Sequence, residues 1–169
     1  MFYRKLFNDG SASKKLLLGI QIDNPKVFIP WDISEMDFVE LFKCHGIDFV
    51  VEKNYYVKNV TLFGENHCNI GVTFEKTIRK IGISRDNCEE DNSLKDKLIK
   101  TPEGCKIYLE KSFKSFQIAL EKEFGKPTKR SKNETGFDEC EWDIGKKIKI
   151  YHYVMDRFGL AEYLWIERI

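Results

Sequence analysis

The chain has 169 residues, of which 42% are hydrophobic and 14% are aromatic. A chain of this length and apolar content can bury a well-packed core, which excludes a disordered or low-complexity protein. Its 28 basic and 27 acidic residues nearly cancel, to a formal charge of +1. Because phosphate contacts need a clear basic excess, this balance argues against a general nucleic-acid binder.

The start of the chain and its cysteines indicate a reducing compartment. The first ten residues include Arg4 and Lys5 but lack the apolar core of a signal peptide. The longest apolar run that follows, at 16–18, is too short to cross a membrane. The five cysteines are odd in number and form no CxxC pair, which is typical of free thiols. We therefore expect a cytoplasmic protein that does not enter a membrane.

Two segments repeat their apolar residues at helical spacing. The first begins at Ser34, whose hydroxyl suits an N-cap, and ends at Gly46. The second runs over 112–124 and is stopped by Gly125 and Pro127. We predict one helix over each segment.

Strand patterns surround both predicted helices, with one strand before each helix and three after it. The expected strands are 16–22, 47–52, 55–63, 67–75, 105–110 and three more from Phe137 onward. A further strand over 78–84 and a short helix near 94–99 are expected between the two sets. This order predicts an α+β fold of antiparallel sheets with two packed helices. We expect a single domain over 1–169, with a βαβββ unit used twice, in halves 14–85 and 103–169 joined by an irregular acidic and helical linker at 86–102.

The C-terminal third alternates apolar and charged residues over two strands separated by Gly145. Folding the chain about this glycine places apolar residues on one face and opposite charges on the other. The predicted pairs are Trp142 with Ile148, Cys140 with Ile150, Asp143 with Lys147, and Glu141 with Lys149. A register shift by one residue would move the apolar side chains to the charged face and the charged side chains to the apolar face.

A third strand collects aromatic residues on the charged face. A turn over 156–159 places Tyr153 opposite Tyr163 and Tyr151 opposite Trp165, beside the lysines of the preceding strand. Two interpretations stay open: the other half covers these rings as a second core layer, or they form a partner-binding face. The interleaved lysines would also permit stacking of single-stranded bases, although the neighbouring carboxylates weaken that option.

The three histidines carry no catalytic or metal-binding pattern. His67 and Cys68 are strand neighbours, so their side chains point to opposite faces. His152 falls on the apolar face, where we expect a buried and hydrogen-bonded ring. His45 suits a helix C-terminus without any further role. We predict no metal and no cofactor.

An acidic segment at 86–92 resembles a calcium loop only superficially. It lacks the central glycine, and Lys97 stands where a bidentate glutamate is required. We expect a solvated loop whose Glu89, Glu90 and Asp91 are available to a basic partner.

The stretch 112–169 resembles the C-terminal ends of small bacterial immunity proteins from polymorphic and contact-dependent toxin–immunity systems. The shared features are a helix ending in Phe-Gly-Lys-Pro at 124–127, a strand bearing Trp142, a hairpin at Gly145 and a closing strand with Tyr163 and Trp165. The resemblance implies a cytoplasmic, non-catalytic protein that binds one toxin and blocks its active site. Acidic patches in such proteins face basic nuclease toxins, although the near-neutral charge departs from the strongly acidic members.

Three hypotheses follow, of which an immunity protein that neutralises a cognate toxin is the first. The alternative is a small-ligand or single-stranded nucleic-acid binding module that uses the aromatic face. The third is an enzyme assembled from distant residues such as His67, Asp86 and Cys88. The residues expected to bind the partner are Tyr151, Tyr153, Tyr163, Trp165, Lys147, Lys149, Glu139, Glu141, Asp143, Glu89, Glu90 and Asp91.

Overall fold

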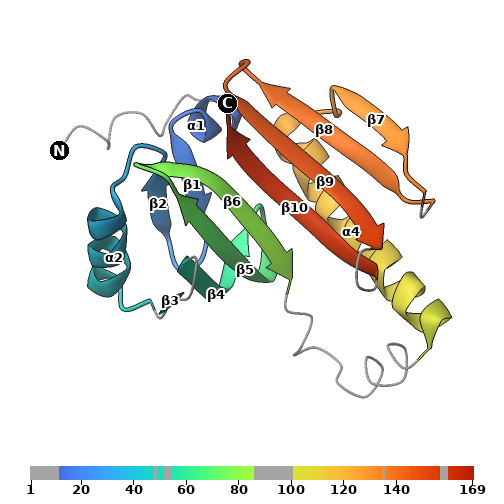
Figure 1. The fold of residues 1–169 in the computed structure, drawn as a ribbon, viewed down its shortest axis with the longest axis horizontal. Helices are drawn as coiled ribbons and strands as arrows, with labels where there is room; N and C mark the ends of the chain where they lie inside the picture. Colours follow the sequence, from blue (N-terminus) through green and yellow to red (C-terminus); the bar gives the residue numbers. More distant parts are fainter. Residues whose placement is uncertain (1–11, 48, 52–54, 86–100, 135, 157–159) are drawn as a thin grey trace.

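The computed structural model describes residues 12–47, 49–51, 55–85, 101–134, 136–156 and 160–169 (Figure 1). It confirms the predicted α+β fold with antiparallel sheets. The described helices are α1 (Ala12–Leu16), α2 (Glu35–Cys44) and α4 (Pro102–Phe124). Strands β1 (Gly19–Ile22) and β2 (Val27–Pro30) form a separate hairpin.

An eight-stranded sheet with the order β3-β4-β5-β6-β10-β9-β8-β7 forms the body of the protein. Its strands are β3 (Phe49–Val51), β4 (Tyr55–Leu62), β5 (Glu65–Phe74), β6 (Ile78–Arg85), β7 (Lys129–Lys132), β8 (Asp138–Ile144), β9 (Ile148–Asp156) and β10 (Leu160–Arg168). Helix α2 is followed by the meander β3–β6, and helix α4 by the meander β7–β10. The last strands of the two meanders, β6 and β10, pair and join them into one sheet.

Helix α2 begins and ends where the sequence predicts. The Ser34 side chain accepts a hydrogen bond from the backbone N–H of Asp37 and so caps the first turn. Gly46 adopts a φ of 64°, which reverses the chain after the last turn. Phe38 and Phe42 lie one turn apart on the face that packs against the sheet, and both are buried.

Helix α4 begins about three turns earlier than predicted, so the strand expected over 105–110 is wrong. Thr101 is its N-cap and accepts a hydrogen bond from Gly104 N–H at 3.0 Å, and Pro102 stands in the first turn. The N-cap threonine and the proline in the first turn favour a helix, although the residues at 105–110 alternate in the manner of a strand. The helix ends as predicted at Gly125, whose N–H donates to the carbonyl of Glu121.

The structure also changes the predicted strands near the N-terminus. The strand expected over 16–22 is divided, because Leu16 ends α1 and β1 begins only at Gly19. A Cβ at Gly19 would lie 2.2 Å from the carbonyl oxygen of Ile29, so only glycine permits this close approach. Strands β2 and β7 and helix α1 were not predicted, since each spans only four or five residues. The short helix predicted near 94–99 lies outside the described residues.

The β8–β9 register differs from the prediction by two residues. Trp142 lies opposite Ile150 and Asp143 opposite Lys149, while Cys140 faces His152. The predicted fold left a single residue for the turn, which is too short for a hairpin, and the chain instead turns through residues 145–147. A shift by two keeps every side chain on its predicted face.

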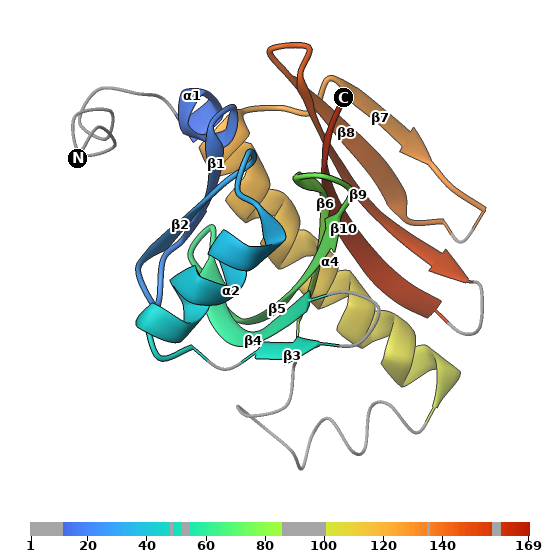
Figure 2. The ribbon, with the colours of Figure 1, turned by 60° about the vertical axis from the view of Figure 1, so that its left-hand side comes forward.

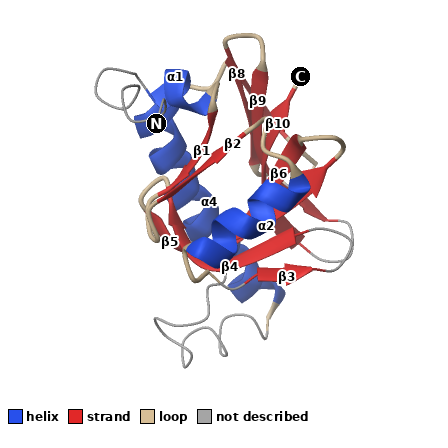
Figure 3. Cartoon of the chain, turned by 90° about the vertical axis from the view of Figure 1, so that its left-hand side faces the viewer, coloured by secondary structure: helices blue, strands red, loops and turns tan. Residues whose placement is uncertain are grey.

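The buried side chains of the large sheet all point toward one side. Figures 2 and 3 show α1, α2, α4 and the β1–β2 hairpin on that same side. Trp142 is one of two tryptophans in this core, with 1% of its surface exposed. Its indole N–H donates to the carbonyl of Gly125 at 2.8 Å and thereby ties the end of α4 to β8.

Replacement of Trp142 by alanine tests this one-sided core. We expect Trp142→Ala to lower the free energy of unfolding by about 3–5 kcal/mol, because it leaves a large cavity and an unpaired carbonyl. The matched control is Trp165→Ala, which removes the same side chain from the opposite side of the sheet. Equal losses for the two variants in urea unfolding would contradict a core on one side only.

Candidate partner-binding face

The side of the large sheet that points away from the helices is called the outer face. A single lateral row of neighbouring residues crosses all eight strands on this face. In strand order the row consists of Val50, Tyr56, Gly71, Gly82, Trp165, Tyr151, Glu141 and Lys129. Because cross-strand neighbours share a face, these side chains form a continuous surface.

Four aromatic side chains of β9 and β10 form the centre of the outer face, and they are called the aromatic cluster. Its members are Tyr151, Tyr153, Tyr163 and Trp165, and all four are half-buried. Tyr153 and Tyr163 stack with ring centroids 5.4 Å apart and planes 20° apart. The predicted pairings of Tyr153 with Tyr163 and of Tyr151 with Trp165 are confirmed. No element of the described residues forms a second core layer over them (Figure 2).

Two lysines lie over the remaining ring faces of the cluster. The Lys80 ammonium lies 2.8 Å from the centroid of the Trp165 ring, and that of Lys149 lies 5.9 Å from the Tyr151 centroid. Burial lowers the pKa of Lys80, against the opposing charge of Glu167. Lys80 was missed in the sequence, because nothing local to β6 indicates that this strand pairs with β10.

The occupied ring faces decide what the cluster can bind. Stacking of nucleic-acid bases requires free aromatic faces. Here the Tyr153 and Tyr163 rings cover each other, and the Lys80 ammonium covers the Trp165 ring. Each of these contacts covers one face of a ring, so less ring surface is open to stacked bases, whereas tyrosine hydroxyl groups can form hydrogen bonds with a protein surface.

A notch of bare backbone adjoins the cluster on β5 and β6. Gly71 and Gly82 lie directly opposite each other in the row. The Tyr56 ring covers Gly71, since a Cβ there would lie 3.1 Å from the ring. A Cβ at Gly82 would meet only the carbonyl oxygen of Gly71, at 3.9 Å, so the space above Gly82 is open. A glycine inside a strand often marks such a close approach, and it is the signal that could have found this notch.

The predicted acidic residues of β8 border the cluster on its other side. Glu141 accepts a hydrogen bond from Lys149 at 2.7 Å, and this bond raises the pKa of Lys149. Burial raises the pKa of Tyr153. The nearby Tyr163 and the exposed Glu139 raise it further.

The remaining predicted partner residues do not join the cluster. The predicted pairing of Asp143 with Lys147 is wrong, because Lys147 lies in the three-residue turn and Asp143 faces Lys149. Asp143 instead accepts a hydrogen bond from the backbone of Lys146 at 3.0 Å. The acidic residues at 89–91 lie outside the described residues.

His152 forms the centre of a buried polar network on the inner side of the sheet. Its side chain is fully buried and contacts Glu162 at 2.7 Å and Gln117 at 3.1 Å, which confirms the predicted hydrogen-bonded ring. Ser112 donates to the same Glu162 carboxylate at 2.5 Å. Because the carboxylate separates the hydroxyl from the imidazole, this is not the geometry of a serine nucleophile. The network attaches α4 to β9 and β10.

The other residues named for catalysis are also dispersed. The ring of His67 contacts Asn59 Oδ1 at 2.9 Å, whereas Cys68 is buried on the inner face, where burial raises the pKa of its thiol to about 12. His45 follows α2 and its Nδ1 lies 2.8 Å from the carbonyl oxygen of Leu41. The residues proposed at 86 and 88 lie outside the described residues. Across the described part of the chain, no three His, Cys, Asp or Glu side chains converge on a possible metal site.

Comparisons with known proteins do not indicate a function for this chain. No protein-family model, curated protein or solved structure matches the chain. None of the described helices is both long and apolar enough to span a membrane.

Replacement of Gly82 by valine tests whether the space above this glycine is open. We expect Gly82→Val to keep or raise the melting temperature, because valine favours strands and the space above Gly82 is open. Gly71→Val is the control, and we expect it to lose about 1–3 kcal/mol because its side chain displaces the Tyr56 ring. Thermal melts of both variants measure the difference. A Gly82→Val variant that melts as early as Gly71→Val would show that the notch is not open.

Proposed function

We propose that the protein is a non-enzymatic interaction protein that binds a partner protein through its outer face. The observation that carries the proposal is the aromatic cluster, four half-buried Tyr and Trp side chains that no described element covers. Tyrosine and tryptophan are the residues most enriched among interface anchors, since they bury a large area at little conformational cost. Here Tyr153 and Tyr163 are already stacked, so binding would require little further ordering of these two rings.

The surroundings of the cluster support a protein interface. Charged residues border the rings on both sides, with Glu139 and Glu141 on β8 and Lys80 on β6. A polar border around an aromatic centre is the usual organisation of a protein–protein interface. The mixed sign of this border does not suit a phosphate backbone, which binds surfaces of one positive sign.

The particular function we propose is that of an immunity protein. The support is the resemblance of 112–169 to bacterial immunity proteins, together with the location of the aromatic cluster within that stretch. The partner would then be a cognate toxin in the same cytoplasm, whose active site the protein covers. The acidic border of Glu139, Glu141 and Asp143 would suit a toxin with a basic surface, such as a nuclease.

Co-expression with the neighbouring gene tests the proposal most directly. We expect the protein of the adjacent open reading frame to be toxic when produced alone, and to be neutralised and co-purified when this chain is present. If the neighbour is harmless and does not bind at micromolar concentration, the immunity function is refuted.

Removal of the aromatic anchors tests the binding face itself. We expect Tyr151→Ala/Trp165→Ala to fold but to bind the partner about 2–4 kcal/mol more weakly, which is roughly 30- to 1,000-fold. A matched control is Ile107→Ala/Ile118→Ala, which truncates exposed apolar residues of α4, 45% and 60% accessible, on the opposite side of the sheet. Isothermal titration calorimetry and thermal melts give both quantities. Unchanged affinity, or a melting temperature as low as that of Trp142→Ala, would contradict the proposed face.

A further inference from the structure

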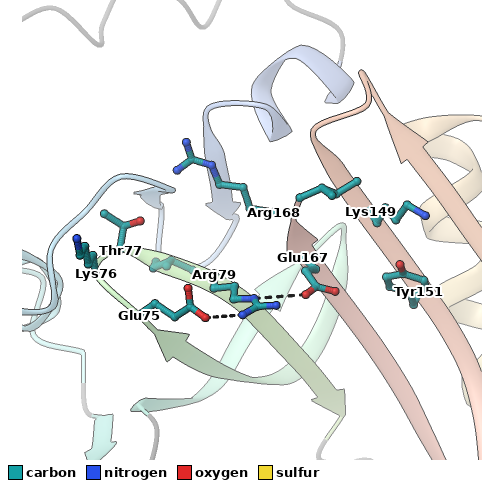
Figure 4. A pocket seen from close by; sticks show the side chains of 10 residues that line it. Glu75, Lys76, Thr77, Arg79, Lys149, Tyr151, Glu167 and Arg168 are labelled. Atoms are coloured by element: carbon teal, nitrogen blue, oxygen red, sulfur yellow. Dashed lines mark hydrogen bonds and ion pairs between the residues drawn. The ribbon is translucent and has the colours of Figure 1, made fainter.

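A groove of about 850 Å³ lies beside the aromatic cluster, across the end of β10, with the β5–β6 turn at one side and β9 at the other (Figure 4). Four cationic side chains line it, against two carboxylate side chains. The cations are Lys76, Arg79, Lys149 and Arg168, and the carboxylates are Glu75 and Glu167. The groove therefore has an excess of positive side-chain charge in a protein that is nearly neutral overall.

The ion pairs inside the groove leave two of these cations available. Arg79 binds Glu75 and lies 3.6 Å from Glu167, so one guanidinium occupies both carboxylates of the groove (Figure 4). The hydrogen bond that Arg79 donates to Glu75 raises the pKa of Arg79 further above its ordinary value. Lys76 and Arg168 are exposed, and neither forms an ion pair with another described residue. The unbalanced charge is therefore located at these two side chains.

The groove and the aromatic cluster form one continuous surface. Tyr151 lines the groove and is also a member of the cluster, and Lys149 lies over its ring. Figure 4 shows Lys76 on the β5–β6 turn at one side of the groove and Tyr151 on β9 at the other. Arg168 lies opposite Ile148, whose side chain is buried on the inner face, so the Arg168 side chain leaves the end of β10 on that side. A protein that is seated on the aromatic cluster would therefore enter the groove beside Tyr151 and reach Arg168 at the end of the sheet.

We propose that this groove receives a carboxylate-bearing loop of the partner protein, with an Asp or Glu side chain bound beside Lys76 and Arg168. This inference rests on the proposed function of the outer face. A peptide segment fits the groove better than a free phosphate does, because Glu75 and Glu167 would repel a multiply charged anion. A loop can place its carboxylate beside the free cations and its backbone N–H groups beside the two carboxylates.

The groove also determines how the partner is oriented. It lies on one side of the aromatic cluster, and the acidic border of β8 lies on the other. A partner must therefore present negative charge above the groove and positive charge above Glu139 and Glu141. The reversed orientation would bring like charges together and would bind more weakly.

The test uses a defined probe and does not require the natural partner. We expect an N-acetylated and C-amidated Gly-Gly-Glu-Gly-Gly peptide, which carries a single carboxylate, to shift the backbone amide resonances of Thr77, Arg79, Lys149 and Arg168 in ¹⁵N-labelled full-length protein. The affinity should fall about tenfold between roughly 0.05 M and 0.5 M salt, because the pairing is exposed to solvent. In the Lys76→Glu/Arg168→Glu variant these shifts should be lost. The control Lys111→Glu/Lys114→Glu changes two exposed lysines of α4 by the same charge and should retain them.

Two outcomes would overturn the groove assignment. One is the absence of these shifts, or their persistence in the charge-reversed variant once its melting temperature shows that it is folded. The other is that inorganic phosphate alone binds at these amides as tightly as the peptide, which would make the groove a site for free anions. Loss of partner binding in the Tyr151→Ala/Trp165→Ala variant would leave the proposed function standing in either case. Retention of binding in that variant would refute the proposed function, whatever the peptide does.

Discussion

Pairing of β6 with β10 is the interaction on which the rest of the structure depends. It joins two four-stranded meanders, each of which would otherwise leave a long strand as an open edge. Its register places Trp165 opposite Gly82 and Glu167 opposite Lys80. The open notch, the ammonium over the indole ring and one side of the groove all arise at this junction.

Packing on one side only explains why no described element covers the outer face. The described helices and the β1–β2 hairpin cover the inner face (Figure 3), so the outer face carries charged and aromatic side chains in place of a second core. The contacts that hold the sheet against α4 include the indole of Trp142 on the Gly125 carbonyl, the buried contacts of His152, and the hydrogen bond from Ser115 to Glu65 on β5. A surface supported in this way is preorganised, which lowers the entropic cost of binding.

The outer face combines an aromatic centre, in which two rings stack, with charge of opposite sign at its two sides. The centre would provide most of the affinity, because stacked aromatic side chains exclude water over a large area. The charges, in contrast, are exposed, and exposed ion pairs contribute little stability. Their effect would be on the choice and orientation of the partner and on the rate of association. This division of roles suits a protein that must distinguish one partner from related ones.

The sequence by itself determined the features that depend on neighbouring residues. Alternation over β8 to β10 predicted which side chains share a face, including the pairs of Tyr153 with Tyr163 and Tyr151 with Trp165. It did not determine the length of the Gly145 turn, because a shift by two residues satisfies the same alternation. Only the tertiary structure decided that β6 pairs with β10, and hence where Lys80, Gly82 and the groove lie. Strands so far apart in the chain carry no local signal of their pairing, since contact between them is decided by the packing of the whole sheet.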